Sequence, residues 1–420
     1  MTKYRTRAAI ACVALLFAAA CSESVDDGGG GNGNGGSSDN GGGEETRTTR
    51  GVTDDSIKVG GIHYSGFFGQ AGLGVEARLE KANAEGGVHG RTIEFVGVED
   101  DANVASNGLE IAQRLVEQEQ VFALLPVMSG AFGGGDYVKD NQIPMFGWGT
   151  HPSFCDSDSA FGVTGCVTHP SLEVGSNALG TALLEHFGSV DGRTVAFLGD
   201  DNDAGRGGIA LLKASVEDLG FEVVMDSASL PAPPDALGDP SPFVAELLSA
   251  DGGDEPDIIY VLGTSNPVQI PAALQGAGYE GMIVLPSYSP LLLGANGYDG
   301  IWLNTQVSMD PEVPANAEML AAVAEVDPDA TFDLSVAVGY WAADFFIKGL
   351  EETGEDLTVE NFLATLNSGD FTYEVEDVVG PSEWPEMHGY PVPCSALTET
   401  RDGAFVPTIP LACGENIDVE

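Results

Sequence analysis

The stretch IKVGGIHYSGFFGQAGLGVEARLEKANAEGGVHGRTIEFVGVEDD, residues 57–101, decides the fold. Its pattern predicts a strand, a glycine-rich loop, a long helix, a glycine turn and a second strand, which is the opening βαβ unit of a parallel sheet. The first strand runs into His63-Tyr64-Ser65-Gly66. Loops that leave parallel strands meet at the carboxyl edge of the sheet, where ligands bind, so this loop is the first candidate for a binding site.

The helix of this unit is predicted from apolar residues that share one face. Leu73, Ala77, Leu79 and Ala82 recur at helical spacing. The pair Gly86-Gly87 then predicts a left-handed end to the helix. Residues 91–98 follow as the next strand, which we expect to be buried.

The same alternation of strands and helices continues downstream. We expect strands over residues 121–127, 143–146, 194–198, 222–225, 258–262, 282–285 and 301–307. We expect helices over residues 104–119, 136–141, 172–187, 205–219, 243–249, 266–277, 315–325, 334–351 and 359–366. Helix 172–187 should carry the chain into a second α/β series, and strand 301–307 should return it to the first. Residues 390–410 should form short extended segments joined by a turn at 401–403. A chain of 420 residues is long enough for two domains.

Three segments carry a resemblance to a known family. "GVTDDSIKVGG" from Gly51, "NAEGGVHGRTIEF" from Asn83 and "EDDAN" from Glu99 resemble the amino-terminal signature of the type I solute-binding proteins of branched-chain-amino-acid-type ABC importers. The resemblance is clearest over residues 51–120, extends to 389, and holds in outline beyond. It implies an α/β fold of two Rossmann-like lobes with parallel-sheet cores, joined by a multi-crossing hinge and closing on a small solute. We place the first lobe at 52–172 plus 309–388 and the second at 173–308 plus 389–420.

The resemblance also implies which residues hold the solute. In the family, hydroxyl and backbone groups of the first lobe bind the carboxylate and ammonium of an amino acid. The matching positions are Tyr64, Ser65, Ser129, Gly130, Trp148, Gly149 and Thr150 in the first lobe, and Asp203, Thr264, Ser265 and Tyr288 in the second. Serine, threonine and glycine also populate turns, so a purely local role for each is the alternative. Trp148 suits either a stacking wall or simple packing.

The second-lobe positions depart from the family's pattern. The family usually places an aromatic residue near the first of these loops and an acid near the last. This sequence has Asp203 at the first and Tyr288 at the last. Asp203 is either the charge that pairs with a solute ammonium or a turn acid, so the sequence leaves open whether the solute is an α-amino acid.

The amino terminus predicts export. Residues 1–20 have basic residues at the start and an apolar run from 8 to 20, which is typical of a signal peptide and shorter than the about twenty residues of a membrane span. Cys21 resembles a lipobox cysteine, although Ala18 stands where the family usually has Leu, and an ordinary cleavage site is the alternative. Residues 21–51 are then a lipidated cysteine and a glycine-rich tether. We expect a lipoprotein on the outer face of the cytoplasmic membrane or in the cell envelope, held to the membrane by the lipid alone.

Four cysteines remain after Cys12 of the signal and Cys21, and they allow three pairings. The pairs Cys155–Cys166 and Cys394–Cys413 would close short loops, as suits an exported protein. Zinc sites usually show C-x-x-C or regularly spaced histidines, and this sequence has neither. We therefore predict two disulfides and no metal.

The charge and the motifs narrow the function. The 65 acidic residues against 16 basic ones give a formal net charge of −49, which opposes binding to nucleic acid. A surface this acidic would keep the protein soluble in a salty medium, and an acidic docking surface for a partner is the alternative explanation. The sequence lacks the G-x-S-x-G, H-E-x-x-H and P-loop motifs. Residues 200–211 resemble a calcium loop but place Leu211 where glutamate is needed. The stretch GFFGQAG could be a phosphate-binding loop, but no acidic residue is placed convincingly to bind a ribose about twenty residues later, so no cofactor is expected.

These observations favour a monomeric, lipid-tethered receptor that delivers a small polar solute to an ABC permease. They do not favour an enzyme. The solute would be a branched-chain or other amino acid, an amide or a related compound. The alternative is a ligand-sensing domain that reports its closure to a separate membrane signalling protein. A secreted enzyme that uses the cleft catalytically is the third class, and the missing catalytic motifs oppose it.

Overall fold

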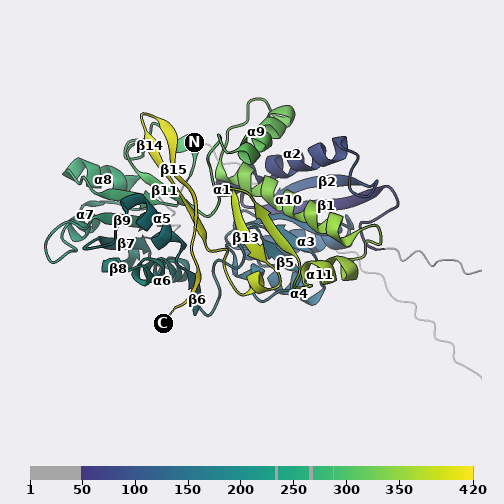
Figure 1. Cartoon of the computed structure of the whole chain (residues 1–420), viewed down its shortest axis with the longest axis horizontal. Coiled ribbons are helices and arrows are strands. Elements are labelled where there is room, and N and C mark those ends of the chain that lie inside the picture. The colour runs from purple at the N-terminus through teal and green to yellow at the C-terminus, as the bar shows by residue number, and fades with distance from the viewer. Residues whose placement is uncertain (1–48, 232–234, 264–267, 287, 420) are drawn as a thin grey trace, which may run out of the picture. The chain divides into compact units, whose positions relative to one another are not determined.

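The computed structural model describes residues 49–231, 235–263, 268–286 and 288–419. Two large sheets, each with helices on both faces, make up most of this part of the chain (Figure 1). The predicted α/β class with parallel-sheet cores is confirmed. The predicted signal peptide, Cys21 and most of the tether lie outside the described residues. Among the described residues, no helix has both the length and the apolar content that a membrane span requires.

The first sheet is wholly parallel, with strand order β2-β1-β3-β4-β5. Its strands are β1 (Ser56–His63), β2 (Thr92–Asp100), β3 (Ala123–Met128), β4 (Met145–Gly147) and β5 (Ala160–Gly162). The helices that follow its strands are α1 (Ser65–Phe68), α2 (Ala71–Ala84), α3 (Ala105–Glu117) and α4 (Gly135–Asp140). The opening βαβ unit predicted from residues 57–101 is therefore confirmed, and a one-turn helix lies in its glycine-rich loop.

Helices from both ends of the sequence cover one face of this sheet. Figure 1 shows α10 beside α2, although hundreds of residues separate them in the chain. The later helices are α9 (Pro314–Val326), α10 (Leu334–Thr353) and α11 (Val359–Leu366). A Cβ on Gly74 would lie 2.0 Å from the Val336 carbonyl oxygen, and one on Gly339 would lie 2.2 Å from that of Ala71. Glycine at both positions lets the backbones of α2 and α10 touch.

The second sheet is mixed, with strand order β15-β14-β11-β10-β9-β7-β8. Its parallel strands are β7 (Thr194–Asp200), β8 (Glu222–Leu230), β9 (Ile258–Leu262), β10 (Met282–Leu285) and β11 (Trp302–Thr305). The antiparallel hairpin β14 (Cys394–Arg401) and β15 (Ala404–Cys413) extends it. Its helices are α5 (Ala178–Phe187), α6 (Asp203–Asp218), α7 (Ser241–Leu247) and α8 (Gln269–Ala277).

Alternate residues of its strands pack on opposite faces. Ala196 and Leu198 join the core that includes α7 and α8, whereas Val195 and Phe197 join the core that includes α5 and α6. The near-continuous apolar runs that predicted these strands follow from this two-sided burial.

The segments that connect the two sheets bond to one another. The amide of Val392 donates to the Thr164 carbonyl at 2.9 Å, and that of Cys166 donates to the Tyr390 carbonyl at 2.9 Å. Two minor two-stranded sheets lie outside the main sheets. One pairs β6 (Val174–Ser176) with β16 (Asn416–Asp418), and the other pairs β12 (Thr372–Val375) with β13 (Val379–Glu383). The short 3-10 helices are η1 (Pro152–Phe154), η2 (Pro290–Leu292) and η3 (Glu386–His388). The lobe boundaries given above stay a prediction.

Several local predictions are wrong. Strand 301–307 does not return to the first series, because β11 pairs with β10 and β14 in the second sheet. Strand 91–98 is not buried, because β2 is an edge strand with much of its length exposed or half-exposed. Helix 172–187 begins only at Ala178, after strand β6. The carboxyl-terminal segments are long strands rather than short ones. The predicted turn at 401–403 is confirmed, with φ of 54° at Asp402 and 73° at Gly403.

Candidate functional site

The loops that leave β1, β2 and β3 are bonded together at the carboxyl edge of the first sheet. The amide of Tyr64 donates to the Met128 carbonyl at 2.9 Å, which joins the exits of β1 and β3. The amide of Ser65 donates to the Asp100 carboxylate at 3.1 Å, and the Ser65 hydroxyl also bonds to that carboxylate. Three strand exits thus meet, as the parallel topology requires.

Asp100 is the exposed charge at this junction. The Ser65 hydroxyl and the amides of Ala102 and Ser65 all donate to its carboxylate, and they lower its pKa from the ordinary value. The carboxylate therefore stays ionised to a lower pH than an unperturbed aspartate. The "EDDAN" segment carries part of the family resemblance, but Asp100 itself was not among the predicted site residues.

The exit of β4 presents Trp148, Gly149 and Thr150. The Trp148 ring makes a T-shaped contact with Phe68 of α1, with centroids 5.5 Å apart. Its carbonyl accepts from the Thr164 hydroxyl at 2.6 Å and from the Thr164 amide at 3.0 Å. The Trp148 indole nitrogen is buried and has no hydrogen-bond partner among the residues that the structure describes. The exit of β4 therefore lies against the exit of β1, and Thr150 is half-buried beside it.

Gly149 has a backbone that requires glycine. Its φ is +106°, and a Cβ at this position would lie 2.1 Å from the Gly165 carbonyl oxygen. Gly149 therefore has the local turn role that was the alternative to ligand binding. The turn sets the positions of its neighbours Trp148 and Thr150.

Ser129 and Gly130 lie at the exit of β3. Ser129 is 5% exposed, and its hydroxyl accepts from the Ala131 amide at 3.2 Å. This bond is a local turn contact of the kind offered above as the alternative to ligand binding. Gly130 is exposed. His63, at the end of β1, is buried with its Nδ1 2.9 Å from the Phe68 carbonyl oxygen.

Of the second-sheet residues predicted to bind the solute, the structure describes the side chain of Tyr288. Tyr288 is 5% exposed, its ring stacks on Phe405 with centroids 4.0 Å apart, and it makes a T-shaped contact with Phe332 with centroids 6.4 Å apart. Burial raises its pKa well above the ordinary value. Tyr288 therefore packs in an aromatic cluster, and its predicted contact with a solute stays a prediction. Thr264, Ser265 and the side chain of Asp203 lie outside the described residues.

The loop before α10 joins the first-sheet exits and was missed from the sequence. The Gln70 side-chain amide donates to Asp333 at 2.7 Å and to Thr331 at 3.0 Å. Asp333 also caps α10 by accepting from the Val336 amide at 2.9 Å. A polar N-cap before an apolar helix is a readable signal, but nothing local shows that this cap faces a residue some 260 positions earlier.

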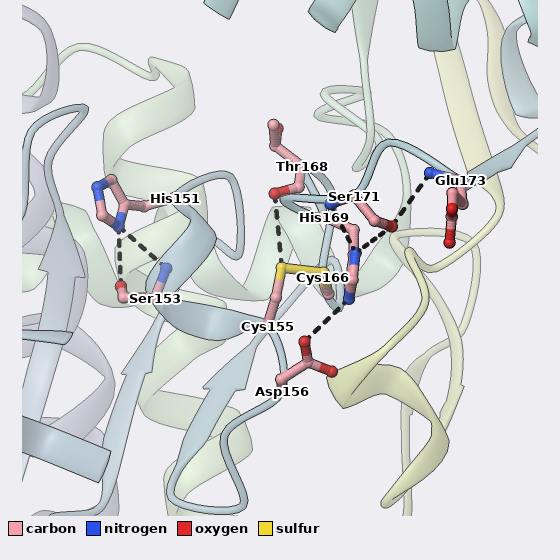
Figure 2. Close-up of a disulfide and its surroundings, with 9 residues drawn as sticks. All are labelled: His151, Ser153, Cys155, Asp156, Cys166, Thr168, His169, Ser171 and Glu173. Carbon is pink, nitrogen blue, oxygen red and sulfur yellow. Dashed lines mark hydrogen bonds and ion pairs between the residues drawn. A yellow bond between two sulfur atoms is a disulfide. The ribbon is translucent and has the colours of Figure 1, made fainter. Parts of the chain in front are cut away.

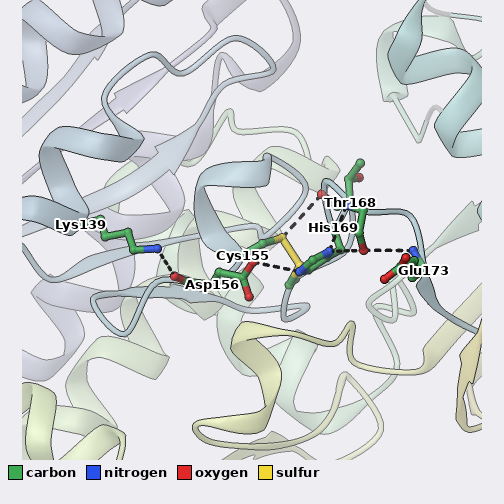
Figure 3. A network of polar contacts seen from close by, with 8 residues as sticks. Lys139, Cys155, Asp156, Thr168, His169 and Glu173 are labelled. Carbon is green, nitrogen blue, oxygen red and sulfur yellow. Dashed lines mark hydrogen bonds and ion pairs between the residues drawn. A yellow bond between two sulfur atoms is a disulfide. The ribbon is translucent and has the colours of Figure 1, made fainter.

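The structure contains both predicted disulfides, and one of them lies next to the exit of β4 (Figure 2). Cys155–Cys166 ties η1 to the segment after β5. His169 lies beside it, with Nε2 3.1 Å from the Asp156 carboxylate and Nδ1 2.8 Å from the Ser171 hydroxyl. Figure 3 shows that Lys139 reaches the same loop, where its ammonium donates to the Asp156 carbonyl at 2.6 Å. These contacts hold the segment that follows Thr150.

The described residues contain no group of three or more His, Cys, Asp or Glu arranged to hold a metal ion. What converges at the first-sheet edge is a set of hydroxyls, backbone groups, aromatic rings and carboxylates. Such a set suits reversible binding of a small molecule.

A family model described as periplasmic binding protein matches residues 56–404. The chain belongs to the periplasmic binding protein family. Together with the two covered sheets, this identifies a type I periplasmic binding protein. Membership of this family implies an exported, extracytoplasmic protein that binds small molecules.

Solved structures of similar fold include several transport proteins. A fatty acid ABC transporter substrate-binding protein from Thermomonospora curvata is 20% identical, with a TM-score of 0.67 over 88% of this chain and 95% of that one. A solute-binding protein from R. palustris in complex with 4-hydroxybenzoate is 19% identical, with a TM-score of 0.63 over 87% and 98%. A leucine-binding protein from Thermotoga maritima is 16% identical, with a TM-score of 0.62 over 85% and 99%. At these identities the likeness extends to the fold alone. No curated protein matches this sequence.

Proposed function

We propose that this periplasmic binding protein is the solute receptor of an ABC importer, not an enzyme, and that it captures a small solute between its lobes and presents it to a permease. The observation that carries the proposal is the junction of the exits of β1, β2 and β3 through Tyr64–Met128 and Ser65–Asp100. The solute would reach this junction from solvent and bind the half-buried Tyr64, Trp148 and Thr150. A solute that prefers the closed arrangement of the lobes would shift the population toward it, and a permease could detect that change.

The first test is the release of small molecules from gently purified protein, followed by mass spectrometry. A released compound that raises the melting temperature when it is added back to emptied protein would identify the solute. If a broad screen of amino acids, amides, carboxylates and amines gave no stabilisation, the receptor proposal would be wrong.

The second test separates the cleft from the rest of the surface. Thr150→Ala should weaken solute binding by about 1–3 kcal/mol if its hydroxyl is a ligand partner that becomes buried on closure. Thr408→Ala is the matched control, because Thr408 is exposed on β15 in the hairpin and bonds only locally to the Val406 carbonyl at 3.3 Å. Equal affinities in both variants and the wild type would contradict the assignment of Thr150. We expect Ser129→Ala to act on the turn first, because Ser129 already bonds to Ala131.

We also propose that Cys21 carries the lipid that holds the receptor at the outer face of the membrane. The support is the sequence pattern alone, a signal peptide followed by a lipobox-like cysteine. Cys21→Ser should abolish metabolic labelling by an alkyne fatty acid and release the protein from membranes. Retention of the label would refute the site. Partners captured with the anchored protein distinguish a permease from a separate signalling protein.

A further inference from the structure

The loops at the carboxyl edges of both sheets are almost without basic side chains. In the first sheet, no lysine or arginine occurs in residues 64–70, 101–104, 129–134 or 148–159. In the second sheet, residues 201–206, 263–268 and 286–300 contain one, Arg206. Arginine and lysine bind anionic solutes most strongly, and Arg206 is the single such residue in these stretches of sequence.

Arg206 is already paired. Its guanidinium donates to the Asp201 carboxylate at 2.7 Å. The same residue lines a surface groove together with Lys213 of α6, Asp226 of β8 and Ile417 of β16. Its charge is therefore balanced by a neighbouring acid, on a side of α6 that faces β8 and the carboxyl-terminal strand.

The other basic side chains that the structure describes are also engaged. Carboxylates pair with Lys58, Arg78, Lys81, Arg114, Arg193, Lys213 and Arg401. Carbonyl oxygens accept from Arg50, Arg91 and Lys139, and Lys348 lies over the Phe371 ring. Between residues 49 and 419, every described lysine and arginine therefore has a partner, and Arg50, Arg91, Lys139 and Lys348, whose partners are uncharged, lie outside the loops named above.

Acids and aromatic rings remain at the first-sheet edge. Asp100 is exposed, and Asp101 is fully buried with one carboxylate oxygen that has no partner among the described residues. His151 has a Coulombic interaction with Asp101, but burial outweighs it and lowers the His151 pKa, so this imidazole is neutral near pH 7. Phe67 is 53% exposed and Trp148 is half-buried, and the rings of both contact the Phe68 ring. Carboxylates and aromatic faces together attract ammonium groups.

We infer that the solute of this receptor is an organic cation that carries a protonated amine, and that anionic solutes are excluded. The inference rests on the proposed receptor function. Asp100 supplies the charge that the ammonium meets, and the rings of Phe67 and Trp148 contact its carbon skeleton. The net charge of −49 also concentrates cations around the whole protein and repels anions before they reach the site.

Matched pairs of probes test the charge with little change in shape. Benzylamine is compared with benzoate, and 3-methylbutylamine with 3-methylbutanoate, by calorimetry and by melting temperature. The measurements use the lowest NaCl concentration at which circular dichroism shows the protein folded. Small molecules from yeast extract, separated into cation-exchange-retained, anion-exchange-retained and unretained fractions, are tested in parallel. We expect stabilisation by the amines and by the cation-exchange-retained fraction, with carboxylates at least about tenfold weaker.

The outcomes separate the two proposals. Stabilisation by carboxylates, or only by the anionic or unretained fraction, would overturn the cation inference and leave the receptor proposal standing. If no probe and no fraction stabilised the protein, the receptor proposal itself would be refuted, and this inference with it.

A variant pair then tests Asp100 with whichever amine binds. Asp100→Asn keeps an oxygen for the Ser65 and Ala102 amides while it removes the charge, and we expect it to weaken the amine about tenfold or more. Glu94→Gln is the control, because it removes an equal charge from the amino-terminal half of the same strand, where Glu94 is exposed and 4.0 Å from Lys58. Equal affinities in the two variants would overturn the role of Asp100.

Discussion

Gly149→Ala tests whether the turn after β4 builds the site. The structure places two costs on the new methyl group. The φ of +106° is one that side chains rarely adopt, which costs about 1–3 kcal/mol. The Cβ would also lie 2.1 Å from the Gly165 carbonyl oxygen and 3.1 Å from the Thr164 hydroxyl, so the backbone must shift, and overpacking of this kind adds about 1–3 kcal/mol. We therefore expect a loss of about 2–6 kcal/mol in the free energy of unfolding.

Gly188→Ala separates the two costs. Gly188 ends α5 with a φ of +73°, and nothing lies within 4 Å of a Cβ built there. Its substitution should cost only the strain of the backbone, about 1–2 kcal/mol. Equilibrium urea unfolding, followed by circular dichroism and tryptophan fluorescence with the disulfides intact, gives both values. If Gly149→Ala were no more destabilising than Gly188→Ala, the close contact with Gly165 would not exist as described.

The same variant has a consequence for binding. The Trp148 carbonyl is fixed by the Thr164 hydroxyl and amide, so a shift at residue 149 must move Trp148 or break those bonds. The affinity for solute should fall in Gly149→Ala and stay unchanged in Gly188→Ala. Unchanged affinity in both would mean that the exit of β4 does not contact the solute.

Three further predictions concern stability. Burial lowers the pKa of His388 from 6.5 to about 4 in the folded protein. Its contribution to stability is therefore fully present above pH 6.5, the pKa in the unfolded chain. Up to roughly 3 kcal/mol is lost as the pH falls from 6.5 through 4. His388→Gln, which keeps a donor for Asn367, should flatten the pH dependence of the unfolding free energy over that range, and an unchanged slope would contradict this reasoning. Asp344→Ala should cost about 3–5 kcal/mol in urea unfolding, because it leaves the Arg78 side chain, 15% exposed, without its carboxylate at 2.7 Å. Asp201→Ala, which removes a carboxylate from the exposed Arg206, should cost less than about 1 kcal/mol, and equal losses in the two variants would show that burial does not govern these pairs. Because the screening length falls from roughly 30 Å at 0.01 M salt to 3 Å at 1 M, NaCl should raise the melting temperature of a protein with a net charge of −49, and sucrose of equal osmolality should raise it less. A melting temperature independent of NaCl would argue against self-repulsion as a major term.

The sequence predicted the fold well where burial and strand order agree. Residues 57–101 carry strong period-two and helical patterns, and their βαβ unit is confirmed. Strand 258–262 is confirmed with the same bounds because both of its faces are covered, so every position is apolar. The strands that were missed, such as β5 and β6, have only three residues each. A run that short contains too few positions to show a period.

The errors arise where tertiary contacts decide the outcome. β2 has the apolar residues of a strand, but nothing within residues 91–98 shows that it takes the edge of the sheet. β11 was sent to the wrong sheet because pairing with β14 joins residues about 90 positions apart. The burial of Tyr288 could not be predicted for the same reason, since its stacking partner, Phe405, comes from the carboxyl-terminal hairpin.

The candidate site divides along the same line. The convergence of the first-sheet loops was predictable because the exits of parallel strands lie at one edge, and the bonds of Tyr64 to Met128 and of Ser65 to Asp100 join these exits. These bonds run between backbone groups or to a side chain at the end of a neighbouring strand, so they hold this edge in place before any solute binds. An edge that is already ordered loses little conformational entropy on binding, and more of the binding energy remains for the solute. A solute that needs a positive partner finds no lysine or arginine in the first-sheet loops, whereas one that needs a negative partner finds Asp100 exposed.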